Sequence, residues 1–398
     1  MSGTVKEAVS LMEVLPESDQ NFVLEFIKKL RFFSLAVILW IIMSITMTAC
    51  SPMQGREEAY SASFFAMDTY MTFTVYDDDA KAAREALQQA QEEIGALEAL
   101  WSVTDEDSDI YALNHSGGQP VTVRDETAGL LSFAVKMAQE TDGALEPTLY
   151  PVLTAWGFTT EVNRIPAAEE IERLLECVGY DRVKVEGSLV TLEDGMMLDL
   201  GSVGKGYAGD RAGRILIEKG INSALLDIGG NIQAVGARPD GSDWRLGLRS
   251  PFGEGIFGTL QISDRAVVTS GNYERYFIGE DGVRYGHIID PETGYPVNNG
   301  LASVTIIAGD GKLCDALSTS LFVMGLSDAV AYWRTHQEEQ PFDMILVTED
   351  RKIYLTEEIK GKFNLRKECK DMVIYPVTSS VAEGKTVITN FDREIYTW

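Results

Sequence analysis

Short β-type runs, separated by turn-forming glycine, aspartate and proline residues, dominate the chain from residue 183 to residue 308. The runs read VKVEGSLVTL, MMLDL, SALLDIGG, WRLGLRS, GTLQIS, AVVTSG, GHIID and ASVTIIA. They are accompanied by one strong helical run, KLCDALSTSLFVMG. A chain of this kind can build antiparallel or mixed sheets, but it lacks the regular strand and helix alternation of a parallel α/β fold.

The preceding part of the chain adds helices. Residues 61–76 alternate apolar and polar side chains like a strand, and residues 78–100 follow with helical spacing. Two more helical runs occupy 127–143 and 167–179, each ending at a glycine. The prediction is an α+β protein in which residues 61–365 form one two-lobed unit and residues 366–398 an uncertain C-terminal tail.

Composition excludes several classes of protein. The 398 residues carry a net charge of −27, which repels nucleic acid, so no nucleic-acid partner is expected. Four cysteines form no CxxC pair, which argues against a disulfide framework or a structural zinc site. The three histidines, His115, His287 and His336, lie far apart in the sequence. A bound metal would therefore take oxygen ligands, as magnesium and calcium do.

The N-terminal region reads as an export signal. Basic residues precede an apolar run that ends in small residues and Cys50, so residues 31–50 are predicted to be a lipoprotein signal peptide. Lipidation of Cys50 would anchor the mature protein to the cell membrane on its extracytoplasmic side, with residues 51–60 as a tether. The alternative is a transmembrane helix. Residues 1–30 form a polar N-terminal extension of unknown role.

The most informative motif is LDLGSVGKGYAGDRA, residues 198–212, where a strand-like run meets a glycine-spaced turn and a helix start. Asp199 could accept hydrogen bonds from a ligand ring, Ser202 could offer an oxygen to a metal, and Lys205 could neutralise a phosphate. The motif is not a Walker A loop, because Gly206 follows Lys205 where Ser or Thr is required. A plain helix N-terminus with a surface lysine is the alternative.

A second motif places Asp315 and Thr319 four residues apart on the helical run, so both point to one face. A carboxylate and a hydroxyl on one face can hold a hard cation. A capping aspartate and a buried threonine that bonds to the backbone would give the same spacing.

The third motif is SGNYERYFIGEDGVRYGHIIDPETGYPV, which gathers Tyr273, Arg275, Tyr276, His287 and Asp290 around two turns. His287 is the candidate general acid or base, because an imidazole titrates near neutral pH. A purely structural β-hairpin is the alternative. Weaker candidates can flank a flat ring or simply fill the core: Met67, Trp101, Glu146, Pro147, Trp156 and Phe158.

Four segments in this order, LDLGSVGKGYA, SGNYERYF, HIIDPETGYPV and DALSTSLFVMG, resemble the FAD:protein FMN transferase family, also called the ApbE family. The similarity covers about residues 60 to 360. It implies a T-fold-like, two-lobed α+β architecture with mixed or antiparallel sheets, flanking helices and a central ligand cleft, and it assigns residues 61–365 to the catalytic unit.

The resemblance also implies the site. The residues that would line the FAD site are Met67, Trp101, Glu146, Asp199, Lys205 and Ile289; Ser202, Asp315 and Thr319 would hold magnesium. The family commonly has aspartate where Glu146 stands, and the residue next to His287 differs from the family pattern.

The implied activity is magnesium-dependent transfer of FMN from FAD to a threonine or serine hydroxyl of an exported or membrane redox protein, with release of AMP. Asp315 would act through the metal, and His287 is the hypothetical base for the hydroxyl proton. Three alternatives remain: a magnesium-dependent FAD pyrophosphatase that uses water as acceptor, an FAD-binding lipoprotein without chemistry, and a structural surface lipoprotein.

Overall fold

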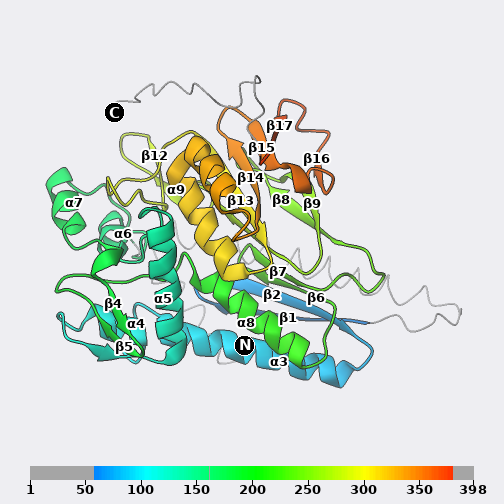
Figure 1. Ribbon diagram of the computed structural model, residues 1–398, viewed down its shortest axis with the longest axis horizontal. Coiled ribbons are helices and arrows are strands. Elements are labelled where there is room, and N and C mark those ends of the chain that lie inside the picture. The colour runs from blue at the N-terminus through cyan, green and yellow to red at the C-terminus, as the bar shows by residue number, and fades with distance from the viewer. Residues whose placement is uncertain (1–57, 161, 380–398) are drawn as a thin grey trace, which may run out of the picture. The chain divides into compact units, whose positions relative to one another are not determined.

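The computed structural model describes residues 58–160 and 162–379 of the chain (Figure 1). The predicted N-terminal extension, the export signal with Cys50 and residues 51–57 of the tether lie outside these residues, as do residues 380–398. Their assignments stay predictions. Residues 58–60, predicted to belong to the tether, instead begin strand β1 (Glu58–Ala66).

A nine-stranded sheet forms the centre of the described part, in the order β1-β2-β6-β7-β10-β13-β14-β15-β17. Its strands span Glu58–Ala66, Thr69–Asp77, Ala224–Ile228, Asn231–Val235, Ala266–Ser270, Leu301–Ala308, Asp343–Thr348, Lys352–Thr356 and Val373–Val377. Neighbouring strands run antiparallel except β15 and β17, which are parallel. The segment beyond residue 365 therefore adds an edge strand to the sheet.

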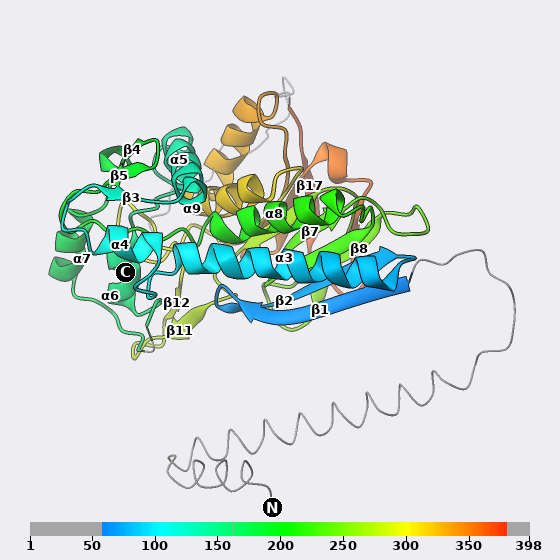
Figure 2. The ribbon, with the colours of Figure 1, turned by 90° about the horizontal axis from the view of Figure 1, so that it is seen from below.

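Three helices cover one face of this sheet: α3 (Ala80–Trp101), α8 (Gly204–Glu218) and α9 (Gly311–His336) (Figures 1 and 2). Their apolar faces share one buried cluster with β2, β6, β10 and β13, in which side chains such as Phe73, Ile94 and Leu317 are fully buried. The opposite face is covered by a smaller sheet of β8 (Trp244–Arg249), β9 (Ile256–Ile262) and β16 (Phe363–Leu365) around a second apolar cluster. The α+β prediction with helix-flanked sheets is confirmed.

The second lobe contains α4 (Asp109–Asn114), α5 (Asp125–Glu140), α6 (Tyr150–Trp156) and α7 (Ala168–Leu175). It also holds a small sheet of β3 (Val121–Thr122), β4 (Lys184–Glu186) and β5 (Leu189–Thr191), and Figure 1 shows these elements together at one side of the large sheet. Beside α6 lies the hairpin of β11 (Tyr276–Ile278) and β12 (Arg284–Gly286), whose Tyr285 and Phe277 pack on the fully buried Trp156.

Residues 61–76, predicted to be one strand, form the hairpin of β1 and β2. Met67 and Asp68 make the turn with φ angles of 49° and 56°, as a tight two-residue hairpin turn requires. The more buried side chains of β1 occupy even-numbered positions up to Ala66, and those of β2 occupy odd-numbered positions from Met71 onward. The turn therefore shifts the alternation of buried and exposed residues by one position. Because the turn contains no glycine, proline or asparagine, the usual sequence signal was missing.

Two other predicted strands are wrong. The run at 196–200 makes only an isolated bridge from Met197 to Leu149. In the run at 286–290 only Gly286 belongs to a strand, as the last residue of β12, and Ile289 makes an isolated bridge to Pro296. The second run turns back on itself, because the Asp290 amide donates to the Tyr295 carbonyl 2.8 Å away. Neither segment therefore has a neighbouring strand long enough to continue a ladder.

Helix α9 extends past the predicted run and is broken at Gly325, whose φ of 79° and ψ of 174° are not helical. The Asn299 side-chain amide donates to the carbonyl groups of Phe322 and Val323, at 2.7 Å and 3.1 Å, and so satisfies carbonyls that the break leaves free. The helix is long and apolar enough to cross a membrane, but 67% of its apolar window is buried in the fold, as in a core helix.

Candidate functional site

The predicted anion-binding motif forms a tight loop before α8. The Asp199 amide donates to the Pro147 carbonyl at 2.9 Å, and Asp199 Oδ1 accepts from the Gly201 amide at 2.7 Å. Lys205 Nζ folds back onto the Gly201 carbonyl at 3.1 Å. No side chain caps the start of α8 among the described residues. In its first turn, however, the Gly204 amide donates to the Leu200 carbonyl and the Gly206 amide to Asp315, both at 2.8 Å, so only the Lys205 amide lacks a partner among the described residues.

Asp315 and Thr319 point from α9 towards this loop. Asp315 is buried, and its Oδ2 accepts from the Gly206 amide at 2.8 Å. Thr319 Oγ1 lies 3.4 Å from the hydroxyl of Ser270, at the end of β10. The helical spacing that predicted one shared face is thus realised where α8, α9 and β10 meet.

The donor set of this junction suits a hard cation in chemical type. Asp315 offers a carboxylate and Thr319 a hydroxyl, and Ser202 adds a half-buried hydroxyl two residues before α8. Within residues 58–160 and 162–379, no cluster of three His, Cys, Asp or Glu side chains forms a metal site. A magnesium ion here would take its remaining ligands, of about six in all, from phosphate and water oxygens.

His287 follows β12 and is held by Arg275. Its backbone amide and its Nδ1 both lie 3.1 Å from the Arg275 carbonyl oxygen. A carbonyl oxygen can only accept, so Nδ1 carries the hydrogen and Nε2 keeps its lone pair. Burial, aided by the positive charges of Arg275 and Lys205, lowers the pKa of His287 to about 4. The imidazole is therefore neutral at neutral pH, with Nε2 free to accept a proton.

Asp199 shares this electrostatic environment. Burial raises the pKa of its carboxyl group, the Gly201 hydrogen bond and the charges of Lys205 and Arg275 act to lower it, and Asp68 acts to raise it. The β1–β2 turn, the loop before α8 and the turn before β11 therefore converge around one carboxylate. Sequence reasoning named Arg275 as a loop residue and gave Asp68 no role. The bond from Arg275 to His287 uses a backbone carbonyl oxygen, so the sequence offered no side-chain signal for it.

Trp101 and Met67 approach the same region from α3 and the β1–β2 turn. The Trp101 ring packs edge-on against Tyr207 of α8, with centroids 5.4 Å apart, and its indole Nε1 is buried without a hydrogen-bond partner among the described residues. The Met67 amide donates to Glu98 at 2.7 Å. A buried, unpaired indole N–H is uncommon and suits a site that receives a polar ligand.

The contacts of Glu146 and Ile289 are with neighbouring loop residues and with a buried apolar cluster. The Glu146 carboxylate accepts from the amide and hydroxyl of Thr148 and from the Tyr180 amide, at 2.9, 2.6 and 3.0 Å. Burial raises its pKa, and these bonds act to lower it. Ile289 is buried in the cluster around Trp156. In the free protein Glu146 thus stabilises its own loop.

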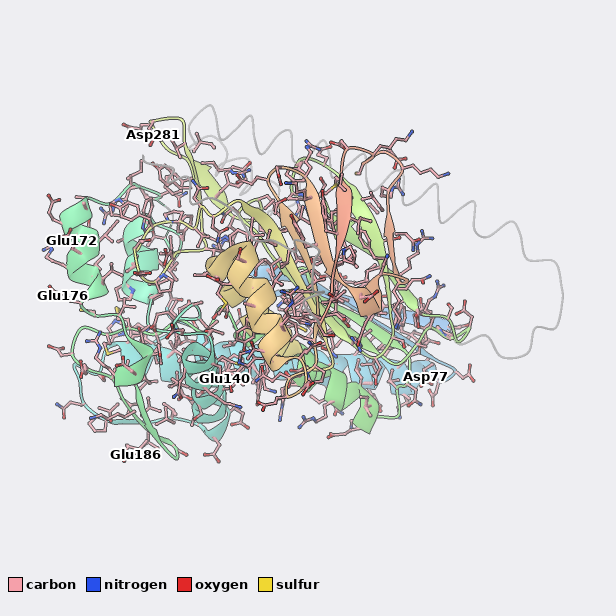
Figure 3. All side chains as sticks on the ribbon, turned by 45° about the horizontal axis from the view of Figure 1, so that its top comes forward. Asp77, Glu140, Glu172, Glu176, Glu186 and Asp281 are labelled. Carbon is pink, nitrogen blue, oxygen red and sulfur yellow. The ribbon has the colours of Figure 1, made fainter. Side chains whose placement is uncertain are left out.

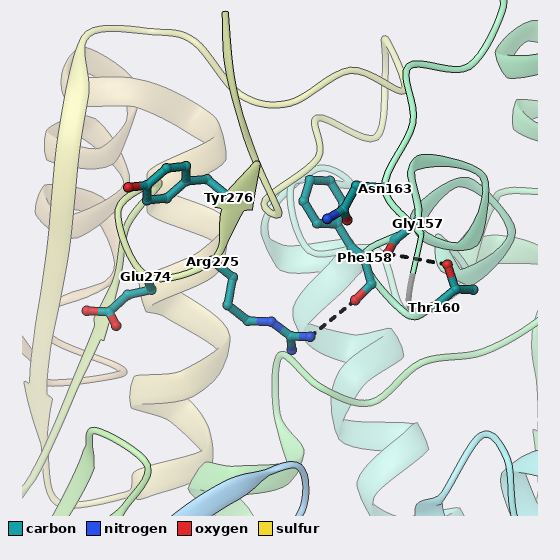
Figure 4. Close-up of a pocket in the computed structure, with 7 residues that line it drawn as sticks. All are labelled: Gly157, Phe158, Thr160, Asn163, Glu274, Arg275 and Tyr276. Carbon is teal, nitrogen blue, oxygen red and sulfur yellow. Dashed lines mark hydrogen bonds between the residues drawn. The ribbon is translucent and has the colours of Figure 1, made fainter. Parts of the chain in front are cut away.

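A cavity of about 300 Å³ lies between the α6–α7 connection and the start of β11 (Figure 4). Its walls come from the α6–α7 connection and the start of β11, and its lining residues are Gly157, Phe158, Thr160, Asn163, Glu274, Arg275 and Tyr276. The Arg275 guanidinium joins the two walls by donating to the Phe158 carbonyl at 3.2 Å. The Phe158 ring also meets the His287 ring edge-on, with centroids 6.4 Å apart. The sequence leaves Phe158 open as a ring-flanking or a core residue, and the structure places it in the wall of this cavity.

A family profile described as the ApbE family matches residues 67–342, which include the helix α8 loop, the His287 segment and the Asp315 face of α9. The chain belongs to the ApbE family. The resemblance drawn from the four sequence segments is confirmed.

Two relatives of this ApbE family chain are both named FAD:protein FMN transferase. It is 32% identical over 311 residues to an FAD:protein FMN transferase of Klebsiella pneumoniae, covering 77% of this chain and 94% of the relative. It is 31% identical over 320 residues to the protein of the same name from Treponema pallidum, covering 75% and 87%.

Solved structures of the ApbE family share the fold. The ApbE protein of Thermotoga maritima superposes with a TM-score of 0.72 at 34% identity, covering 77% of this chain and 99% of that one. The flavin transferase ApbE of Vibrio cholerae gives 0.69 at 26% identity, covering 77% and 100%.

Proposed function

We propose that this ApbE family chain is an FAD:protein FMN transferase that uses Mg²⁺ to move FMN from FAD to a threonine or serine hydroxyl of another protein, releasing AMP. The observation that carries the proposal is the meeting of the α8 loop, the Asp315 face of α9 and the neutral His287 imidazole in one region. The names of the relatives support the same activity.

FAD binding would use groups with no other required role. The unpaired Trp101 indole N–H and the half-buried Asp199 carboxylate would face the flavin, and the side chain and backbone amide of Lys205 at the start of α8 would face the pyrophosphate. Asp315, Thr319 and Ser202 would hold Mg²⁺. When bound, the ion would withdraw negative charge from the pyrophosphate and make the FMN phosphorus more electrophilic.

The transfer step needs one proton acceptor. The acceptor hydroxyl oxygen attacks the FMN phosphorus as its proton passes to His287 Nε2, and the bond from that phosphorus to the bridging oxygen breaks. The bridging oxygen leaves with AMP, and the new bond is a phosphoester between FMN and the acceptor. His287 fits the role because the Arg275 carbonyl fixes its Nδ1–H tautomer.

The direct test incubates the exported part of the chain with FAD, Mg²⁺ and a threonine-bearing candidate acceptor, followed by denaturing electrophoresis. Flavin fluorescence that stays on the denatured acceptor, together with stoichiometric AMP, is the expected result. Free FMN and AMP without labelled acceptor would replace the proposal with the pyrophosphatase. Intact FAD with every acceptor tried would leave only flavin binding.

We further propose that lipidation at Cys50 tethers the enzyme to the outer side of the cell membrane, where the acceptor would be an exported or membrane redox protein. The sequence before Cys50 supports this. Cys50→Ser should abolish incorporation of a labelled fatty acid and retain the uncleaved signal. Labelling of the Cys50→Ser variant at the wild-type level would contradict the anchor.

A further inference from the structure

The register of the β11–β12 hairpin places Arg275 directly opposite His287. Tyr276 pairs with Gly286 in the ladder. The next pair along is Arg275 and His287, joined by the bond from the His287 amide to the Arg275 carbonyl at 3.1 Å. Directly opposed residues of an antiparallel pair carry their side chains on one face, with Cβ atoms about 5 Å apart. Arg275 and His287 therefore share a face of the hairpin, and in Figure 4 the Arg275 side chain extends away from that of Tyr276.

The Arg275 guanidinium has one hydrogen bond and no carboxylate partner. It donates to the Phe158 carbonyl at 3.2 Å, whereas the adjacent Glu274 pairs with Arg249. This bond keeps the guanidinium near the imidazole, because the Phe158 ring meets the His287 ring edge-on with centroids 6.4 Å apart. Within residues 58–160 and 162–379 the guanidinium forms no other hydrogen bond or ion pair. Since it offers five N–H donors, most of them remain available to an anion.

Lys205 is likewise bonded only to a carbonyl group. Its Nζ donates to the Gly201 carbonyl at 3.1 Å, and its charge and that of Arg275 both lower the pKa of His287. Both charges also act on Asp199, but among the described residues neither cation forms a hydrogen bond with that carboxylate. The chain has 61 acidic and 34 basic residues. Two cations that lie near one histidine and still lack a carboxylate partner therefore indicate an anionic ligand.

We propose that Arg275 is a further catalytic residue, whose guanidinium leaves the Phe158 carbonyl and donates two hydrogen bonds to the non-bridging oxygens of the phosphoryl group that carries FMN. The inference rests on the proposed FMN transfer, which brings this phosphorus next to His287. A planar guanidinium matches two phosphate oxygens at once. It stabilises the negative charge on these oxygens while the bond to the AMP oxygen breaks and His287 takes the acceptor proton.

Arg275→Ala tests this role, because the variant keeps the carbonyl that holds His287. At saturating FAD, Mg²⁺ and acceptor, the single-turnover rate should fall at least about 100-fold, as on loss of an oxyanion donor. Millimolar methylguanidinium should then raise the rate of the variant at least about tenfold, the contribution of one hydrogen bond to a charged group. The matched control is Arg284→Ala, on the opposite face of the hairpin, where Cζ lies 5.2 Å from the centroid of the Tyr276 ring. Its rate should stay within about threefold of the wild type and should not respond to methylguanidinium.

A wild-type rate in Arg275→Ala overturns the proposal. A slow variant that methylguanidinium does not restore also overturns it, because the loss would then come from the broken contact with Phe158. Affinity for inorganic pyrophosphate gives a readout that does not depend on transfer. With Mg²⁺ present, titration calorimetry should show at least about tenfold weaker pyrophosphate binding by Arg275→Ala and unchanged binding by Arg284→Ala, and equal affinity in Arg275→Ala contradicts the assignment. Failure of the wild type to label any acceptor would instead count against the transferase activity, and calorimetry would still test Arg275.

Discussion

The Asp315 carboxylate on α9 accepts a hydrogen bond from the Gly206 amide of α8, 2.8 Å away, although 109 residues separate them in the sequence. The contact requires the two helices to approach very closely. A Cβ atom on Gly206 would lie 2.2 Å from the Gly311 carbonyl oxygen and 2.8 Å from the Asp315 Cβ. Glycine at this position therefore permits the junction that presents Asp315.

Gly206→Ala should destabilise the protein by about 1 to 3 kcal/mol, as overpacking does, and should lower activity further by displacing Asp315. Chemical denaturation and the transfer assay measure both effects. Gly213→Ala in the same helix is the control, because its Cβ would meet only ordinary contacts at 3.5 Å. Equal free energies of unfolding for the two variants would show that α8 and α9 can move apart without loss of stability.

Asp315→Asn should abolish the dependence of activity on Mg²⁺ and lower the transfer rate by at least about 100-fold, because losing a direct ligand should cost no less than losing a partner that merely orients one. Asparagine retains an oxygen that can accept from Gly206, so the melting temperature should change little. Asp315→Ala removes both functions and should also melt earlier. Wild-type activity in Asp315→Asn would remove Asp315 from the proposed metal site.

His287→Ala should lower the transfer rate by about 10² to 10⁴-fold, the usual contribution of a general base, without weakening FAD binding. Single-turnover kinetics at saturating acceptor measure the chemical step. A full transfer rate in His287→Ala would assign proton removal to another group.

The pKa of about 4 for His287 has a definite pH consequence. The kcat/KM of the free enzyme should stay flat from neutral pH down to about pH 5 and fall near pH 4, rather than near the ordinary histidine value of about 6.5. A bell shape with its acid limb near pH 6.5 would contradict the buried, neutral imidazole.

The same shift affects stability. Below about pH 6.5 the unfolded chain protonates His287 while the folded chain does not, so stability is lost as the pH falls from 6.5 to about 4 and is unaffected by this group above 6.5. The loss is on the order of 3 kcal/mol. Comparing wild type with His287→Gln by urea denaturation at pH 7 and pH 4.5 isolates it, since glutamine does not titrate.

Periodicity and punctuation were sufficient for three of the helices, whereas the short helix α6 (Tyr150–Trp156) was not predicted. The runs at 78–100, 127–143 and 167–179 correspond to α3, α5 and α7, because apolar spacing and terminal glycines are local signals. The turn at Met67 and Asp68 and the extension of α9 past Gly325 could not be predicted in this way. In both, tertiary contacts impose a conformation that the local sequence does not favour.

The candidate site was predictable in its parts but not in its contacts. Asp315 and Thr319 could be paired by helical spacing, whereas the partners Gly206 and Ser270 lie in other elements. The role of Arg275 depends on a backbone carbonyl oxygen, which any residue possesses, so no side-chain pattern could indicate it.

Acidic side chains occur on widely separated elements, as the labelled Asp77, Glu186 and Asp281 show (Figure 3). With a net charge of −27, the protein surface should favour acceptor proteins that are neutral or basic around the target hydroxyl. Raising the salt concentration should therefore slow labelling of a basic acceptor more than that of a neutral one, and equal slowing would argue against electrostatic steering.

Strand β2 pairs with β6, joining Met71 to Ile228 across more than a third of the chain. The pairing closes a long loop, which is a slow event in folding because the entropy of closure is lost before the contact is gained. The flavin region draws on the β1–β2 turn, the start of α8 and α9, so it is assembled only after this closure. A growing or truncated chain that lacks α9 lacks Asp315 and Thr319, so under the proposed function loading with FAD should follow the addition of α9.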